Sequence, residues 1–275
     1  MKVVVCIPTL AGTVSAWTLE SIMRLYPSAT LGDEANQIIE IADTWLWPYD
    51  LARVRSRAAR KFLAISDATH LFFVDADIVF PPMLLPRLLK TGLDVVSAPY
   101  PRRDIRWDLA FEAARAGEHP EHAAYEYVYR TLAPLDTASQ TFEVAGVGMG
   151  ATLISRRCIE EMHRAYGTFP AESPANGCED LRAWDNHPTQ GGETVMLFAM
   201  QWGEMNGKRH LFGEDLSFCN RWRAIGGKCH LYVGPGAPAS HYAGHYFRGT
   251  PEGFAKHAAR GDSSGEPRKL PGGGL

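Results

Sequence analysis

The sequence has no long apolar run and no excess of charge of either sign. Its apolar runs stay well short of the roughly 20 residues that span a bilayer. The 28 Lys and Arg against 31 Asp and Glu leave a formal net charge of −3. We therefore expect neither a transmembrane protein nor a polybasic, histone-like one. Residues 1–8 are apolar but too short for a signal peptide, so we interpret them as a first strand and expect a cytoplasmic protein.

Cysteines are few, and their spacing is uninformative. There are five, an odd number, and no two have the C-x-x-C spacing. A disulfide framework or a structural zinc site is therefore not expected. Hydrophobic residues at 45% and charged residues at 21% are typical of a globular protein and exclude wholesale disorder.

Strand and helix patterns alternate along the chain. Strands are predicted at residues 3–7, 37–42, 70–74, 94–98, 125–132, 140–147, 149–154 and 228–233. Helices are predicted at residues 13–26, 50–65, 81–91, 156–166 and 213–225, with a long loop at 167–194. The alternation predicts an α/β fold with a mostly parallel central sheet flanked by helices. Residues 261–275 are rich in Gly, Ser and Pro, which predicts a flexible tail.

Two carboxylates follow the strongest strand signal. Asp75 and Asp77 stand directly after residues 70–74. The carboxyl end of a buried strand is where open α/β sheets bind ligands. Two uncompensated charges there must stay hydrated or hold a cation, and a hard divalent metal carrying phosphate oxygens fits. The alternative is a surface turn, where Asp is common.

Two later motifs could complete such a site. Glu214 and Asp215 open a predicted helix, where an acid could cap the helix or serve as a general base. His241 and His245 lie in a polar, aromatic loop, either as hydrogen-bonded side chains or as metal ligands.

Basic and glycine-rich segments allow further alternatives. The polar side of the 50–65 helix is expected to be mostly solvated, with one or two side chains reaching a phosphate. A second basic cluster lies beside Trp107, and the two together could follow a nucleic-acid backbone. Residues 146–150 contain three glycines, which permit either close ligand approach or sheet packing. The two basic clusters are Arg53, Arg55, Arg57, Arg60 and Lys61, and Arg102, Arg103 and Arg106.

Taken in order, these motifs resemble those of GT-A glycosyltransferases, similar to family 2 and to the compact bacterial and phage type. Residues 71–77 resemble the D-x-D motif, and Pro8-Thr9 resembles the start of the nucleotide pocket. Glu214-Asp215 with Arg221-Trp222-Arg223 resembles the E-D helix, and residues 241–249 resemble the late histidine motif. An arginine-rich helix precedes the D-x-D and Pro99-Tyr100-Pro101-Arg102-Arg103 follows it. Ala243 replaces an expected glycine, and Ser56 replaces the more usual asparagine.

The resemblance implies an enzyme that moves a sugar from a nucleotide-diphosphate sugar, most commonly a UDP-sugar, to a hydroxyl. It implies a GT-A domain over residues 1–260, with a nucleotide-sugar half at 1–107 and an acceptor half at 108–260. Asp215 would be the base, and Glu214 would orient the acceptor or the base. Mn²⁺ or Mg²⁺ would be held by Asp75, Asp77 and His241. Donor contacts would come from Pro8, Thr9, Arg53, Arg55, Arg57, Asp75, Ala76 and Gly148.

The same resemblance implies a bacterial or phage-infected cytoplasm, and a hydroxylated base in phage DNA as one acceptor. Two other functions fit parts of the sequence. Residues 75–79 also match the D-x-D-x-[T/V] pattern of HAD-type phosphohydrolases, with Asp75 as nucleophile and Asp77 as acid/base. That family places its motif on the first strand and needs a later paired acid, and no Asp-Asp pair follows here. The other alternative is a non-catalytic module that binds sugar or nucleic acid.

Overall fold

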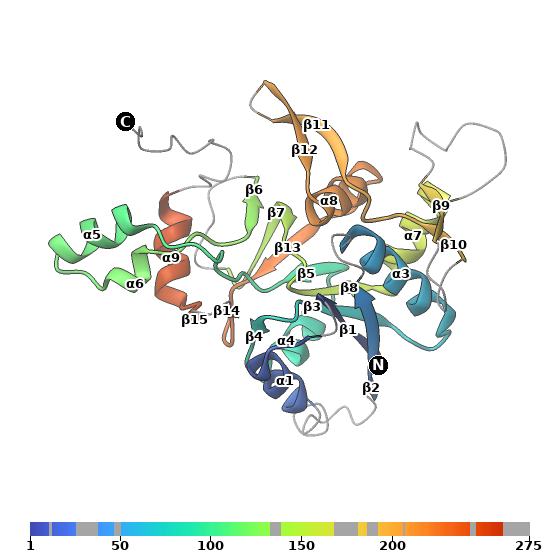
Figure 1. Cartoon of the computed structure of the whole chain (residues 1–275), viewed down its shortest axis with the longest axis horizontal. Coiled ribbons are helices and arrows are strands. Elements are labelled where there is room, and N and C mark those ends of the chain that lie inside the picture. Colours follow the sequence, from blue (N-terminus) through green and yellow to red (C-terminus); the bar gives the residue numbers. More distant parts are fainter. Residues whose placement is uncertain are drawn as a thin grey trace.

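The computed structural model of the chain describes residues 1–10, 13–25, 38–46, 51–132, 139–167, 181–185, 192–205, 207–242 and 246–260. These residues form a mixed α/β structure around an eight-stranded sheet (Figure 1). In sheet order the strands are β2 (Ile38–Leu46), β1 (Lys2–Leu10), β3 (His70–Val74), β8 (Ala151–Ser155), β5 (Val95–Ser97), β13 (Cys229–Tyr232), β7 (Thr141–Val147) and β6 (Tyr129–Thr131).

The direction of the strands corrects the expectation of a mostly parallel sheet. β1 pairs in parallel with β2 and β3, and β5 pairs in parallel with β13. The other four neighbouring pairs are antiparallel, because β8 enters between β3 and β5 in the reverse direction and β7 reverses beside β13. A strand that is buried on both faces has a continuous apolar sequence whether its neighbouring strands are parallel or antiparallel. The sequence pattern therefore identified the strands but not their directions.

The central strands are buried on both faces. In β1, Val4 and Cys6 join one apolar cluster, whereas Val3 and Val5 join another. β3 alternates in the same way, as expected for a period of two along a strand. Helices complete the two layers (Figure 1). The first cluster includes side chains of α3 (Leu51–Ala64), α7 (Arg156–Gly167) and α8 (Glu214–Ala224), and the second includes side chains of α1 (Ala16–Met23) and α4 (Leu84–Lys90).

Smaller elements surround this sheet. Figure 1 shows three helices gathered on the side of β6, and a two-stranded hairpin that projects beyond α8. The three helices are α5 (Trp107–Arg115), α6 (Pro120–Ala123) and α9 (Pro251–Arg260), and the hairpin is β11 (Gln201–Met205) with β12 (Lys208–Phe212). Neither that hairpin nor α9 was predicted from the sequence.

Other expectations meet the structure to different degrees. Within the predicted 167–194 loop, β9 (Arg182–Asp185) and β10 (Gly192–Val195) form an antiparallel pair, which corrects that prediction, while 168–180 and 186–191 lie outside the described residues. The described cysteines are free thiols, as expected. Within the described ranges, no helix combines the length and the apolar character needed to cross a membrane. The predicted tail, residues 261–275, lies outside the description.

Candidate functional site

The predicted acidic turn lies at the carboxyl edge of the sheet. β3 ends at Val74, and the turn that contains Asp75 and Asp77 follows directly. β1 runs beside β3 in the same direction, so its end, with Pro8 and Thr9, lies along the same edge. The backbone N–H of Ser15 donates to the carbonyl of Ala76 at 2.8 Å, which ties the start of α1 to the turn. The structure therefore brings the predicted start of the nucleotide pocket to the D-x-D motif.

Arg55 forms the inner part of the site. It extends from α3, its Nη2 donates to Asp75 Oδ1 at 2.6 Å, and its Nη1 donates to Glu214 Oε1. The Arg55 side chain is only 2% exposed, and its Nε has no hydrogen-bond partner among the described residues. Burial acts to lower the pKa of Arg55, but the carboxylates of Asp75 and Glu214 raise it and prevail, so the guanidinium stays charged. We call Arg55, Asp75 and Glu214 the inner group.

This placement corrects the expectation of a mostly solvated arginine face on α3. Arg55 and Arg57 are buried, Arg60 is half-buried with its Nη1 3.3 Å from the carbonyl of Glu193, and Arg53 is exposed. α3 packs against the sheet on one side and against β10 and α7 on others, so more of its circumference is covered than a surface helix would allow. Of the three arginines predicted to contact the donor, Arg53 is exposed to solvent, whereas Arg55 and Arg57 are buried.

Asp77 forms the outer part of the site. Its Oδ1 lies 3.1 Å from His241 Nε2, and its Oδ2 lies 3.1 Å from Arg103 Nη1. Burial acts to raise the pKa of Asp77, but the hydrogen bond with His241 and the charge of Arg103 outweigh it and leave the pKa below its usual value. Asp77 is therefore an anion at neutral pH. We call Asp77, His241 and Arg103 the outer group.

A small sheet places His241 beside Asp77. β4 (Ile78–Val79) follows Asp77 directly and pairs with β14 (Ser240–Tyr242), so that His241 stands opposite Ile78. The N–H of Tyr242 donates to the carbonyl of Asp77 at 2.8 Å. His245, the alternative predicted ligand, lies outside the described residues.

The second ring nitrogen of His241 has a partner of its own. His241 Nδ1 lies 3.0 Å from the carbonyl oxygen of Pro101. Because that oxygen can only accept, Nδ1 donates to it, and Nε2 in turn donates to the Asp77 carboxylate. Metal-binding histidines are oriented by such a contact to a backbone carbonyl.

Asp215 lies in the first turn of α8 without capping it. The N-cap is Gly213, so the helix-capping alternative for either acid does not apply. Asp215 Oδ1 accepts from the N–H of Leu216 at 2.7 Å. Burial raises the pKa of Asp215 to about 6 and the charge of Glu214 adds to the rise, while Arg55 opposes it. A carboxylate with a pKa in that range suits a general base near neutral pH.

Tyr100 is a site residue that carried no predicted role. Its hydroxyl accepts from the N–H of Gly150 at 3.0 Å, and its ring stands edge-on to His241 with ring centres 5.7 Å apart. A Cβ on Gly148 would come within 2.2 Å of the Tyr100 hydroxyl. The carbonyl of Gly148 also accepts from Thr152 Oγ1 at 2.7 Å. For Gly148, the geometry favours the packing alternative over direct donor contact.

The predicted metal ligands are only partly gathered. Asp77 and His241 adjoin, but Asp75 is engaged by Arg55. Across the described ranges, no three His, Cys, Asp or Glu side chains form a group that could hold a metal ion. Asp77 and His241 nevertheless present a carboxylate and an imidazole, two ligand types that divalent cations accept.

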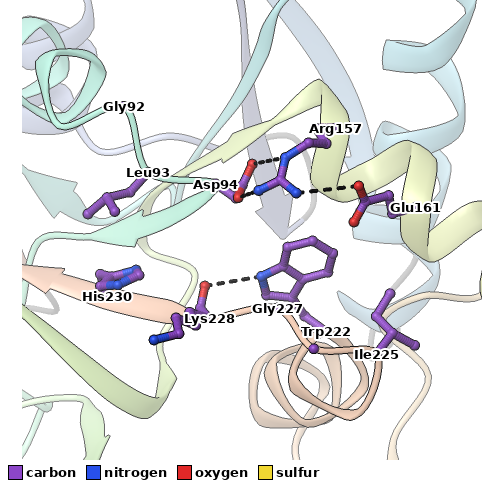
Figure 2. Close-up of a pocket in the computed structure, with 11 residues that line it drawn as sticks. Gly92, Leu93, Asp94, Arg157, Glu161, Trp222, Ile225, Gly227, Lys228 and His230 are labelled. Atoms are coloured by element: carbon purple, nitrogen blue, oxygen red, sulfur yellow. Dashed lines mark hydrogen bonds and ion pairs between the residues drawn. The ribbon is translucent and has the colours of Figure 1, made fainter.

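A separate cavity of about 420 Å³ lies at the opposite edge of the sheet, where β5 and β13 begin (Figure 2). Arg157 is held between Asp94 and Glu161, with its Nε 3.0 Å from Asp94 Oδ1. Trp222 Nε1 donates to the carbonyl of Lys228 at 3.1 Å. These charged groups satisfy one another, and none belongs to the inner or outer group. The carboxyl edge, rather than this cavity, is therefore the candidate functional site.

Comparison with known proteins gives structural similarity only. No family model and no curated protein matches the chain. Among solved structures, 46 chains match, including one described as "Crystal Structure of A197 from STIV". That chain is 17% identical, with a TM-score of 0.47, and the alignment covers 88% of this chain and 86% of the other. A likeness at this level carries no functional argument, so the function is argued from the site alone.

Proposed function

We propose that the protein is a metal-dependent glycosyltransferase that moves a sugar from a nucleotide-diphosphate sugar to a hydroxyl acceptor, in a bacterial or phage-infected cytoplasm. The observation that carries this proposal is the meeting of four carboxylates with a buried arginine and an oriented histidine at one edge of the sheet. Four separate segments of the chain supply these groups. The four carboxylates are Asp75, Asp77, Glu214 and Asp215.

The donor diphosphate belongs with the outer group in this proposal. Asp77 and His241 would hold the cation, and a carboxylate with an imidazole suits Mn²⁺ better than Mg²⁺, which prefers oxygen ligands alone. Bound there, the ion would supply Lewis-acid neutralisation of the charge on the departing diphosphate. The Arg103 side chain is 57% exposed, so it can exchange Asp77 for a phosphate oxygen.

Asp215 is the proposed base. The acceptor hydroxyl oxygen forms a bond to the anomeric carbon as the bond from that carbon to the diphosphate oxygen breaks. The hydroxyl proton passes to Asp215, and the nucleoside diphosphate leaves with the electron pair. Arg55 fixes Glu214 directly beside Asp215, so the inner group positions the base without touching the substrate.

The two other candidate functions receive less support. The phosphohydrolase mechanism needs Asp75 as a free nucleophile, but Arg55 engages its Oδ1 at 2.6 Å. The second basic cluster is also largely paired, with Arg103 on Asp77 and Arg106 shared by Asp108 and Glu126. Neither basic cluster thus offers a free row of cations for a DNA backbone. A hydroxylated DNA base stays a candidate acceptor, but the DNA would have to be bound by another surface.

The test is a donor screen. Wild-type protein is incubated with a panel of nucleotide-diphosphate sugars, with Mn²⁺ or with EDTA, and release of free nucleoside diphosphate is followed. We expect one donor to be hydrolysed slowly with Mn²⁺ only, and Asp77→Asn to abolish that release. Asp108→Asn is the matched control, since Asp108 is paired with Arg106 outside the site. Release from no donor, or equal release by Asp77→Asn, would contradict the proposal. Phosphate release from a generic phosphomonoester would favour the hydrolase instead.

A further inference from the structure

Two sequence motifs that the proposed reaction does not use meet beside the site. The first is Pro99-Tyr100-Pro101, which follows β5, and the second is the glycine-rich segment 146–150, which leads from β7 into β8. Tyr100 is 5% exposed, and its hydroxyl accepts from the N–H of Gly150 at 3.0 Å. A Cβ on Gly150 would come within 2.8 Å of Cζ of Tyr100, and a Cβ on Gly148 would come within 2.2 Å of its hydroxyl. These glycines therefore make room for the tyrosine.

Gly150 connects the Tyr100 hydroxyl to the acidic turn. The carbonyl of Gly150 accepts from the backbone N–H of Asp75 at 3.0 Å. Through this one residue, the Tyr100 hydroxyl holds the backbone at which the turn of Asp75 and Asp77 begins. Burial raises the pKa of Tyr100, and the charges of Asp75 and Asp215 raise it further, so the hydroxyl stays protonated at neutral pH.

The ring of Tyr100 stands against the histidine of the outer group. It lies edge-on to the His241 imidazole, with ring centres 5.7 Å apart and ring planes at 89°. The next carbonyl, that of Pro101, accepts from His241 Nδ1 at 3.0 Å. The preceding one, that of Pro99, accepts from the N–H of Ala239 at 2.9 Å. Proline fixes its own φ and restricts the residue before it, so the backbone that carries the Tyr100 ring has little freedom to move.

We infer that Tyr100 is a positioning residue that holds the two proposed metal ligands, Asp77 and His241, at a fixed spacing. Its hydroxyl sets the place of the acidic turn, and its ring sets the place of the imidazole. This inference rests on the proposed function, in which that pair holds the cation. Residues that orient metal ligands without touching the metal typically change metal affinity about 10- to 100-fold when they are replaced.

Two substitutions separate the ring from the hydroxyl. Tyr100→Leu removes both, and we expect it to weaken Mn²⁺ binding to the full chain about 10-fold or more, measured by electron paramagnetic resonance. Tyr100→Phe keeps the ring against His241 and loses only the hydroxyl, so it should weaken Mn²⁺ binding less.

Tyr166→Leu is the matched control. Tyr166, on α7, is also 5% exposed, and its hydroxyl also bonds to the backbone, donating to the carbonyl of Arg221 at 3.0 Å. It belongs to neither the inner nor the outer group. Tyr166→Leu should therefore lower the melting temperature, as Tyr100→Leu does, but leave the affinity for Mn²⁺ unchanged.

The metal-free protein gives a second readout that needs neither cation nor donor. The Nδ1–H proton of His241 is bonded to Pro101, so it should give a ¹⁵N-resolved nuclear magnetic resonance signal in the wild type and in Tyr100→Phe. Tyr100→Leu should lose this signal by exchange with water, because the imidazole is no longer held against that carbonyl.

Three results would overturn the inference. These are equal Mn²⁺ affinity of Tyr100→Leu and a wild type that binds the ion, an equal loss of affinity in Tyr166→Leu, or a His241 Nδ1–H signal that persists in Tyr100→Leu. The first result would leave the transferase proposal standing. Failure of the wild type to bind Mn²⁺ would instead contradict the proposed function, and the metal-free signal would still decide whether Tyr100 positions His241.

Discussion

Asp75 and Asp77 are equally exposed, but the arginines that they contact differ in exposure. Both side chains are 27% exposed, and each contacts an arginine. The arginine of the inner group, Arg55, is 2% exposed, whereas that of the outer group, Arg103, is 57% exposed. A buried guanidinium fixes its carboxylates, while an exposed one can be exchanged for another ligand. The inner group is therefore suited to position the site, and the outer group is suited to bind a ligand.

The largest expected effect comes from removing the buried cation. Arg55→Met should cost about 3–5 kcal/mol of unfolding free energy, since it leaves Asp75 and Glu214 facing each other without a counter-charge. Arg103→Met should cost less than about 1 kcal/mol, as exposed pairs do. Urea denaturation of the two variants measures the difference. Equal losses in both would break the distinction between the groups.

Asp215 differs from both Asp75 and Asp77, because its side chain makes no ion pair among the described residues. Its pKa is raised to about 6, so the native state holds a proton that the unfolded state releases between about pH 4 and pH 6. Stability from this group is present below pH 4 and is lost as the pH rises through 6. Asp215→Asn should therefore raise the unfolding free energy by about 1–2 kcal/mol at pH 8 and by little at pH 4.

Thermal melts of Asp215→Asn and wild type across this pH range give the measurement. Asp108→Asn is the control with the opposite sign, because hydrogen bonds from Arg106 lower the pKa of Asp108. If the unfolding free energy gained by Asp215→Asn did not change with pH, burial of the Asp215 charge would not be its cause.

The smallest expected effect concerns the outer group. Arg103→Ala removes a cation that competes for Asp77, and such exposed pairs are worth about 0.2–1 kcal/mol. Mn²⁺ should then bind the free protein about 2- to 5-fold more tightly. Titration of Mn²⁺ followed by electron paramagnetic resonance measures this. Weaker Mn²⁺ binding in Arg103→Ala would show that Arg103 supports the site rather than competing for it.

Local sequence patterns predicted the edge of the sheet at which the site lies. The apolar run at 70–74 is β3 to the residue, and Asp75 and Asp77 follow it as expected. Glu214 and Asp215 begin α8, as the helical pattern indicated. These predictions succeeded because each depends on a few neighbouring residues and on the meeting of strand ends at one edge.

Long-range pairing could not be predicted in the same way. Arg55 and Glu214 are 159 residues apart, and helical periodicity alone placed Arg55 on the polar side of its helix. The directions of the strands could not be predicted from the local pattern either. The β11–β12 hairpin, in contrast, could have been predicted, because the sequence contains a local signal for it. Asn206-Gly207 between two short strand patterns is a strong hairpin signal, and Gly207 has a φ of 71°.

Calorimetric titration of Mn²⁺ in the presence of UDP measures whether Asp77 and His241 hold a metal ion for a nucleoside diphosphate, as we propose. We expect the wild type to bind with one-site behaviour and Asp77→Asn to bind at least about 10-fold more weakly, with its melting temperature nearly unchanged. Equal Mn²⁺ affinity in both proteins, or no binding by either, would show that Asp77 does not hold the ion.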